Sequence, residues 1–170
     1  MRTLAICILV FGELLLAGVT AAQNQPAAPE ADTVSCNFAD GKQITVRYNR
    51  IPFDKKERLR DGRIWMPGGS AMVLFTGADL KFGGKNIPTG AYTMYLIPGK
   101  KAWTLVVSKN EKPESAYDAQ QDLARGSMDL GQLSQPTDKL TLYFGQMGPK
   151  LCSLRVYYGS TGAFTEFDEQ

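Results

Sequence analysis

The sequence predicts an all-β fold, namely an antiparallel β-sandwich, jelly-roll or Ig-like, of about seven to nine short strands. Three observations predict this class. Apolar residues recur with a period of two, as Ile44, Val46 and Tyr48 do in the segment QITVRY, and this is the pattern of a half-buried strand. Turn-forming glycine and proline residues recur about every ten residues. One segment alone, near 113–125, favours a short helical turn.

The expected strands follow one another between these turns. They are QITVRY at 43–48, two short strands within AMVLFTGADLKF at 71–82, YTMYLI at 92–97, AWTLVVS at 102–108, KLTLYF at 139–144 and LCSLRVYYG at 151–159. Each is rich in the β-branched and aromatic residues that strands favour. Pro98 and Gly99 stand between the third and fourth of these segments. Proline followed by glycine is typical of a tight turn, so we expect a hairpin there.

The helical turn is expected within PESAYDAQQDLARG at 113–126. Proline and glutamate at its start suit a first helical turn, and the closing glycine suits a stop. In a helix, Asp118 and Asp122 would lie on one face because they are four residues apart. Two neighbouring carboxylates suit glycoside hydrolysis or a hard cation. The competing interpretation is a loop in which Asp122 caps the chain or pairs locally with Arg125.

The order of segments predicts one exported domain. Residues 1–22 carry Arg2, an apolar run and then small residues, which is the layout of a secretory signal peptide. Residues 23–33 are rich in Pro, Ala and Gln and are expected to form a disordered leader. Residues 34–170 are expected to form a single domain. We expect the mature chain to be periplasmic or extracellular, with no transmembrane segment.

Two cysteines remain after the signal peptide, Cys36 and Cys152. In an oxidising compartment two remaining cysteines usually pair. In an extended strand, Cys36 would point to the same side as Phe38, and Cys152 to the same side as Leu154 and Val156. These neighbours are residue types that usually lie in the core. We therefore expect a disulfide between them, the alternative being two buried free thiols. The bridge would close a long loop and add about 4 kcal/mol in the chain-entropy model.

Composition excludes several classes of function. A net charge of +2 is too small to indicate nucleic acid as a partner. The basic stretch at 42–63 holds eight basic and three acidic residues, which favours a solvated face over a polyanion- or lipid-binding one. The chain has no histidine, which removes the usual serine and cysteine triads and histidine-based metal sites. We expect no metal and no cofactor, and we name no catalytic residue.

Several motifs, taken in order, carry a family resemblance. They are a strand ending in Tyr48 and Arg50, a segment with Gly62, Arg63 and Trp65, the turn and strand NIPTGAYTMYLI, the strand of Trp103, and the run with Tyr117, Asp118, Asp122, Leu123 and Arg125. Together they resemble the secreted bacterial family known as domain of unknown function 2911, over about 41–167. The resemblance implies an exported all-β domain with no established activity.

The chain departs from that family at two places. An arginine and a Gly-Ala-Asn-Glu run typically follow the tryptophan, whereas here Met66 follows Trp65, and Ser70 and Ala71 stand near the expected Asn and Glu. A Trp-Gly pair usually precedes the later tyrosine, and here the run reads PESAY. If the family has a polar site built from those groups, part of it is missing here, which favours binding over catalysis.

These observations predict a non-catalytic binding or envelope-associated module whose partner is a small molecule or a glycan. Candidate ligand-binding residues are Arg63, Trp65, Tyr117, Asp118, Asp122 and Arg125, provided that they converge on one concavity. Exposed tyrosines and tryptophans could form a sugar- or peptide-binding platform, but core packing and cross-strand pairing are the favoured explanation of these residues. The alternative function is a carboxylate-dependent hydrolase of an envelope or extracellular glycan, with Asp118 or Asp122 as the working group. The sequence leaves the oligomeric state open.

Overall fold

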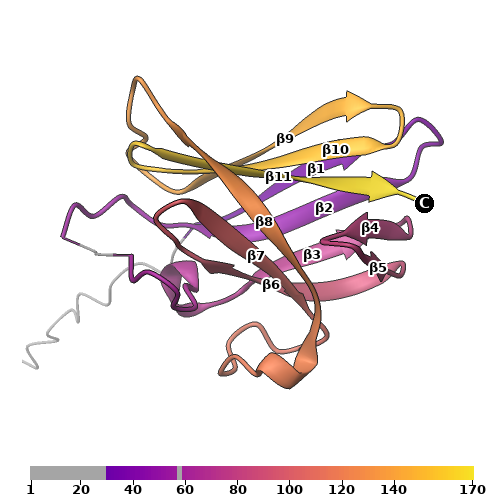
Figure 1. The fold of residues 1–170 in the computed structure, drawn as a ribbon, viewed down its shortest axis with the longest axis horizontal. Coiled ribbons are helices and arrows are strands. Elements are labelled where there is room, and N and C mark those ends of the chain that lie inside the picture. The colour runs from indigo at the N-terminus through magenta and orange to yellow at the C-terminus, as the bar shows by residue number, and fades with distance from the viewer. Residues whose placement is uncertain (1–29, 57–58) are drawn as a thin grey trace, which may run out of the picture.

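The computed structural model describes residues 30–56 and 59–170. The expected signal peptide and most of the expected leader lie outside these residues. The strands are β1 (Glu30–Asn37), β2 (Gln43–Arg50), β3 (Met72–Thr76), β4 (Leu80–Phe82), β5 (Lys85–Ile87), β6 (Gly90–Ile97), β7 (Ala102–Ser108), β8 (Asp122–Gln132), β9 (Thr141–Gly148), β10 (Leu151–Tyr158) and β11 (Thr161–Glu169) (Figure 1). The strand β1 thus begins four residues before the expected start of the domain at 34.

The strands form one antiparallel sheet in the order β1-β2-β3-β6-β7-β8-β11-β10-β9. The short strands β4 and β5 form a hairpin beside this path, with β4 paired to the end of β11. The end strands β1 and β9 approach each other, so the sheet is nearly closed into a barrel-like shape (Figure 1). The predicted all-β antiparallel class is confirmed. The eleven described strands exceed the expected seven to nine, and two separate sheets of a sandwich are not clearly formed.

A disulfide and several backbone contacts hold the seam between the two ends of the sheet. Cys36 on β1 is bonded to Cys152 on β10, the neighbour of β9, with an S–S distance of 2.05 Å. The predicted disulfide is therefore confirmed. At the other end of the seam, Leu140 N donates to Ile51 O at 2.8 Å and Phe53 N donates to Asp138 O at 2.8 Å. Closure of this kind covers edge strands that would otherwise pair with other chains.

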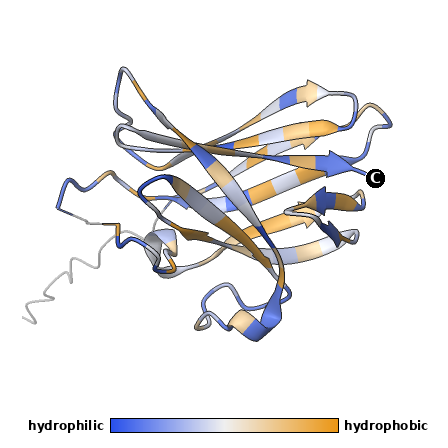
Figure 2. Ribbon diagram, in the orientation of Figure 1, coloured by the Kyte–Doolittle hydropathy of each residue, from blue (hydrophilic) through white to orange (hydrophobic). Residues whose placement is uncertain are grey.

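The main core fills the inside of this curved sheet. Its residues are the alternate positions of each strand, such as Ile44, Val46 and Tyr48 of β2, which are at most 3% exposed. Figure 2 shows the same alternation as apolar and polar bands along the strands. The hairpin β6–β7 follows the predicted segments closely. The period-two pattern that predicted strands therefore also identified the inward-facing residues.

A second, smaller core lies on the outer side of β6 and β7. Tyr95 and Val106 are fully buried there together with Ala71. The covering residues come from two connections, the segment 64–71 and the segment 109–121, which contributes Tyr117. Four consecutive residues of β6, from Thr93 to Leu96, are buried as a result. This part of the sheet is covered on both faces.

The predicted helical turn is shorter than expected. Only Ala119–Gln121 forms a turn of 3-10 helix, and Asp122 is already the first residue of β8. Pairing of β8 with β7 explains the difference, because Ala124, Gly126 and Met128 alternate inward as strand residues. Asp118 and Asp122 therefore do not share a helix face. Among the described residues, no helix is long and apolar enough to span a membrane.

Candidate functional site

Three of the predicted site residues form one hydrogen-bonded cluster at the start of β8. The Tyr117 hydroxyl donates to Asp122 Oδ2 at 2.7 Å. Arg125 Nε donates to the same oxygen at 2.7 Å, and Arg125 Nη2 lies 2.6 Å from it. Arg125 Nη2 also donates to the Tyr117 hydroxyl. We call these three residues the Tyr–Asp–Arg cluster.

Charge and burial in the cluster favour one protonation state. Burial, followed by the hydrogen bond to the Asp122 carboxylate, raises the pKa of Tyr117 to about 12. The same carboxylate, through its hydrogen bond, raises the pKa of Arg125. At neutral pH the phenol is therefore neutral and the arginine charged, so the cluster is a poor source of a mobile proton. The second carboxylate oxygen, Asp122 Oδ1, is buried and has no hydrogen-bond partner within the described residues.

The cluster holds the connection between β7 and β8 against the sheet. The Tyr117 ring packs edge-on against Tyr95, with centroids 5.0 Å apart. At the base of the connection, Lys109 N donates to Gln121 O at 2.8 Å. Asp122 and Arg125 belong to β8 itself, so their bonds to Tyr117 tie the connection to a strand. The observed role of the cluster is thus to position the segment 109–121.

The other three predicted site residues lie apart from these contacts. Asp118 caps the 3-10 turn, its Oδ1 accepting from Gln120 N at 2.9 Å. Trp65 is buried in the main core, where its ring contacts Trp103 and Tyr158. Arg63 is exposed in the connection before Trp65. Tyr117, by contrast, packs in the outer core. Ligand binding at the six residues stays a prediction, and the structure brings together Tyr117, Asp122 and Arg125.

A different surface carries the exposed apolar side chains. Four large apolar side chains are exposed among the described residues, and three of them, Tyr143, Met147 and Phe164, lie on β9 and β11. Between these strands runs β10, with Arg155 directly opposite both Tyr143 and Phe164 in register. We define the β9–β11 face as Tyr143, Met147, Arg155, Tyr157 and Phe164.

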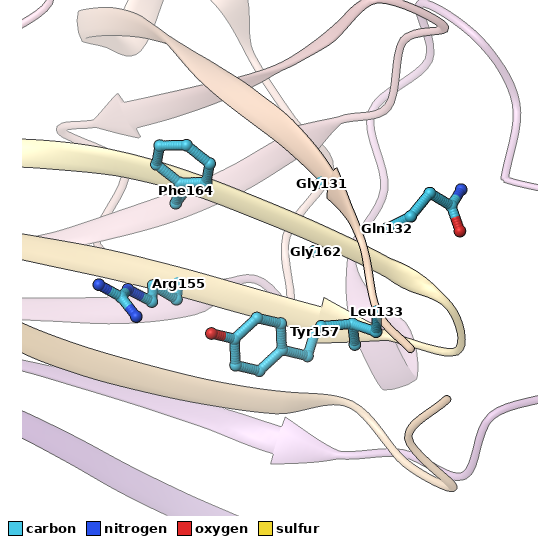
Figure 3. Close-up of a pocket in the computed structure, with 7 residues that line it drawn as sticks. All are labelled: Gly131, Gln132, Leu133, Arg155, Tyr157, Gly162 and Phe164. Atoms are coloured by element: carbon cyan, nitrogen blue, oxygen red, sulfur yellow. The ribbon is translucent and has the colours of Figure 1, made fainter. Parts of the chain in front are cut away.

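A pocket of about 210 Å³ opens on this face (Figure 3). Arg155 and Tyr157 of β10 and Phe164 of β11 line it, and Gly131 and Gly162 supply side-chain-free backbone between them. A methyl group on Gly162 would lie 3.3 Å from the Tyr157 ring, so glycine lets that ring lie flat on β11. The pocket therefore has aromatic and guanidinium side chains at its sides, and glycine backbone without side chains between them.

The guanidinium of Arg155 has no charged partner in the described part of the chain. No ion pair there includes it, and its nearest polar contact is Met147 Sδ at 3.8 Å. Sequence reasoning did not single out this arginine, although the signal was present. In LCSLRVYYG, Arg155 and Tyr157 alternate with Leu154, Val156 and Tyr158, which are buried. Strand parity alone therefore places both residues outward.

A metal centre is not evident in the described residues, where no group of three or more Cys, Asp or Glu side chains gathers.

The chain matches one protein family over most of its length. The model of the family described as "Protein of unknown function (DUF2911)" matches residues 29–165. The chain belongs to this family. The resemblance noted from the sequence motifs is thereby confirmed, whereas no curated protein and no solved structure matches the chain.

Within this DUF2911 domain, the positions that depart from the family motif lie around the outer core. Met66 stands at the place where the resemblance leads us to expect an arginine, and it packs against the cluster of Tyr95 and Val106. Ala71 is 6% exposed in the same cluster. These two residues belong to the covering segment 64–71 and pack on the outer side of β6 and β7. This part of the DUF2911 domain is thus a packed layer.

Proposed function

We propose that the protein is an exported, non-catalytic binding module that takes a glycan on the β9–β11 face. One observation carries the proposal: exposed aromatic rings flank an unpaired arginine on an open strand surface, with a pocket beside them (Figure 3). Large exposed apolar groups are costly to leave in water, and when they gather they usually mark a binding surface.

The chemistry of the face suits a sugar chain. The apolar faces of sugar rings pack on aromatic side chains, and sugar hydroxyls or carboxylates accept hydrogen bonds from a guanidinium. The pocket, about 210 Å³, is smaller than the roughly 300–1,000 Å³ of typical small-molecule sites. It therefore fits one unit of a longer ligand. The surrounding strands leave the face open, so the rest of a polymer can extend along it.

The disulfide supports the exported location. Cys36 and Cys152 are bonded, and disulfides persist in oxidising compartments such as the periplasm or the medium. The apolar run within 1–22 supports the same conclusion as a signal peptide. Envelope and extracellular polysaccharides are the glycans that such a module meets.

The alternative of a carboxylate-dependent hydrolase receives less support. Asp118 accepts a capping hydrogen bond from Gln120 N. Asp122 Oδ2 accepts from both Tyr117 and Arg125. Both aspartates are therefore better explained as structural groups.

A glycan-array screen with the mature protein tests the proposal, followed by titration of the best ligand. Phe164→Ala is expected to weaken binding roughly tenfold, because it removes a stacking surface. Arg155→Gln is expected to weaken the binding of acidic glycans more than that of neutral glycans, because it removes the charge and keeps much of the side-chain volume. Thermal unfolding of each variant checks that the fold is retained.

Phe75→Ala is the matched control, because Phe75 is 41% exposed and Phe164 is 42% exposed, on strands far apart in the sheet order. It is expected to leave glycan affinity unchanged. No binding across neutral and acidic glycans would contradict the proposed function. Binding that Phe75→Ala weakens and Phe164→Ala does not would show that the β9–β11 face is the wrong surface.

A further inference from the structure

A second cavity lies on another part of the barrel, over the outer side of β2, β3 and β6. Its volume is about 470 Å³, within the usual range for a small ligand. Val73 and Thr93 form its floor, as neighbours in register on β3 and β6. Arg47 of β2, next to Val73 in the same row, stands on one side. Glu111 and Pro113 of the connection between β7 and β8 stand on the other.

The wall formed by this connection is fixed by hydrogen bonds at several points. Asn110 Nδ2 donates to the Tyr95 hydroxyl at 3.1 Å and to Ser115 Oγ at 2.7 Å. Pro113 O accepts from Ala71 N at 2.9 Å. Further along, the Tyr–Asp–Arg cluster holds the same segment to β8. A wall that is already ordered loses little conformational entropy when a ligand binds.

The floor carries a polar group without a partner. Thr93 is 1% exposed, and its hydroxyl is buried with no hydrogen-bond partner in the described part of the protein. An unsatisfied buried hydroxyl is destabilising, and a ligand group that reaches it from the cavity would remove that cost. The neighbour of Thr93 across the sheet, Ser108, is by contrast satisfied, because its hydroxyl donates to Gln121 O at 3.2 Å.

The two sides of the cavity carry opposite charges. Arg47 and Glu111 are both exposed, and neither takes part in an ion pair among the described residues. Two strand spacings of about 4.8 Å separate Arg47 from Thr93, so the charged walls stand roughly 10 Å or more apart. A ligand complementary to them has an anion at one end, a cation at the other and a polar group between.

We propose that this cavity binds a short peptide of two or three residues with free termini. Its carboxylate pairs with Arg47, its ammonium pairs with Glu111, and a central amide completes the hydrogen bonding of the Thr93 hydroxyl. Two or three extended residues span roughly 7–10 Å, which matches the separation of the charged walls. Val73 and Pro113 offer apolar surface to one side chain. This site is separate from the glycan face and does not depend on it.

The test is calorimetric titration of the mature protein with a set of apolar di- and tripeptides, each in free, N-acetylated and C-amidated form. The free peptides are expected to bind, and capping either end is expected to weaken binding about tenfold or more. The Arg47→Gln variant is expected to bind the C-amidated peptide as tightly as the free peptide. The Glu111→Gln variant is expected to bind the N-acetylated peptide as tightly as the free peptide. If a cap weakens binding to the unmodified protein but not to the matching variant, the side chain and that peptide terminus are in direct contact. A general change of fold would weaken the binding of all peptide forms.

Thr93→Val and Arg60→Gln complete the test. Thr93→Val keeps the side-chain shape and is expected to weaken every peptide form alike, while the unliganded protein unfolds at a higher temperature. Arg60→Gln is the matched control for Arg47→Gln, because Arg60 is also exposed with no ion pair in the described residues, and it should change nothing. Absence of peptide binding at millimolar concentration, or equal affinity for capped and free peptides, would overturn the proposal.

Discussion

The outer side of β6 and β7 and the outer side of β9 to β11 belong to the same sheet and differ in what covers them. On β6 and β7, Tyr95 and Val106 are completely buried under the segments 64–71 and 109–121. On β9 and β11, Tyr143 is 56% and Phe164 is 42% exposed. In both places an aromatic residue alternates with core residues along a strand. The covering connections, and not the strand sequences, decide whether that residue is packed or exposed to solvent.

The same difference separates two groups of polar side chains. The recognisable motif of Tyr117, Asp122 and Arg125 belongs to the covered region, where it fastens a connection in place. The unpaired Arg155 belongs to the open region. The residues of this motif therefore hold a connection to the sheet, whereas the strand surface around Arg155 is open to solvent. Three experiments examine this contrast.

The largest expected effect is on the covered side. Tyr95→Ala removes a completely buried ring and should lower the free energy of unfolding by about 3–5 kcal/mol. Tyr143→Ala removes an exposed ring and should change it by about 0.5 kcal/mol or less. Urea denaturation of the two variants measures both values. Equal losses would mean that the two outer sides do not differ in packing as described.

The disulfide should have the next largest effect, because it cross-links the two ends of the sheet across a sequence separation of 116 residues. Replacing both cysteines, Cys36→Ala with Cys152→Ala, should lower the free energy of unfolding by about 2–4 kcal/mol. Denaturation with and without reductant measures the same quantity in the unmodified protein. The double variant serves as the control, since reductant should leave it unchanged. The disulfide would be contradicted if reductant did not change the free energy of unfolding and the unmodified protein had two free thiols.

The smallest expected effect is on how the free energy of unfolding changes with pH in the alkaline range. Burial and Asp122 raise the pKa of Tyr117 to about 12 from an ordinary value of 10.0. The unfolded chain therefore loses this proton first as pH rises. The stabilising contribution is complete below pH 10 and is lost as pH rises through about 12. Urea denaturation across this range should show a steeper fall for the unmodified protein than for Tyr117→Phe.

Tyr143→Phe is the control for that titration, since it removes an exposed phenol from the open side. Its stability profile should run parallel to that of the unmodified protein. If Tyr117→Phe is equally parallel, then the Tyr–Asp–Arg cluster does not couple to the stability of the fold.

Much of the fold was predictable because local pattern and tertiary structure agree. The alternation in 43–48 and 151–159 predicted both strands and their inward residues. The disulfide followed from parity and compartment, and Cys36 and Cys152 do face the interior. The number of strands was underestimated because β1, β5, β8 and β11 were not among the expected segments. The strand β1 begins inside the expected leader and β8 begins inside the expected helical segment, so local composition favoured other structures there.

The candidate site was predictable only in part, since long-range packing decides it. The alternative of a local pair predicted the contact of Asp122 with Arg125, which is present. It did not predict that the Tyr117 hydroxyl joins this pair. Trp65, in contrast, enters the core through a single bridge between its backbone and that of Leu96. Nothing in the sequence near Trp65 indicates the strand it meets. The same limit applies to the cavity between Arg47 and Glu111, whose walls are 64 residues apart in the chain.

The place of β11 in the strand order has a consequence for how the protein is made. The strand β11 lies between β8 and β10, inside the sheet and away from its two ends. Without residues 161–169, β8 and β10 each keep an unpaired edge, and the strand order is broken between them. Distant pairings of this kind form slowly. We therefore expect the pairing of β11 with β8, and with it the closure of the sheet, to follow the local β10–β11 hairpin during folding.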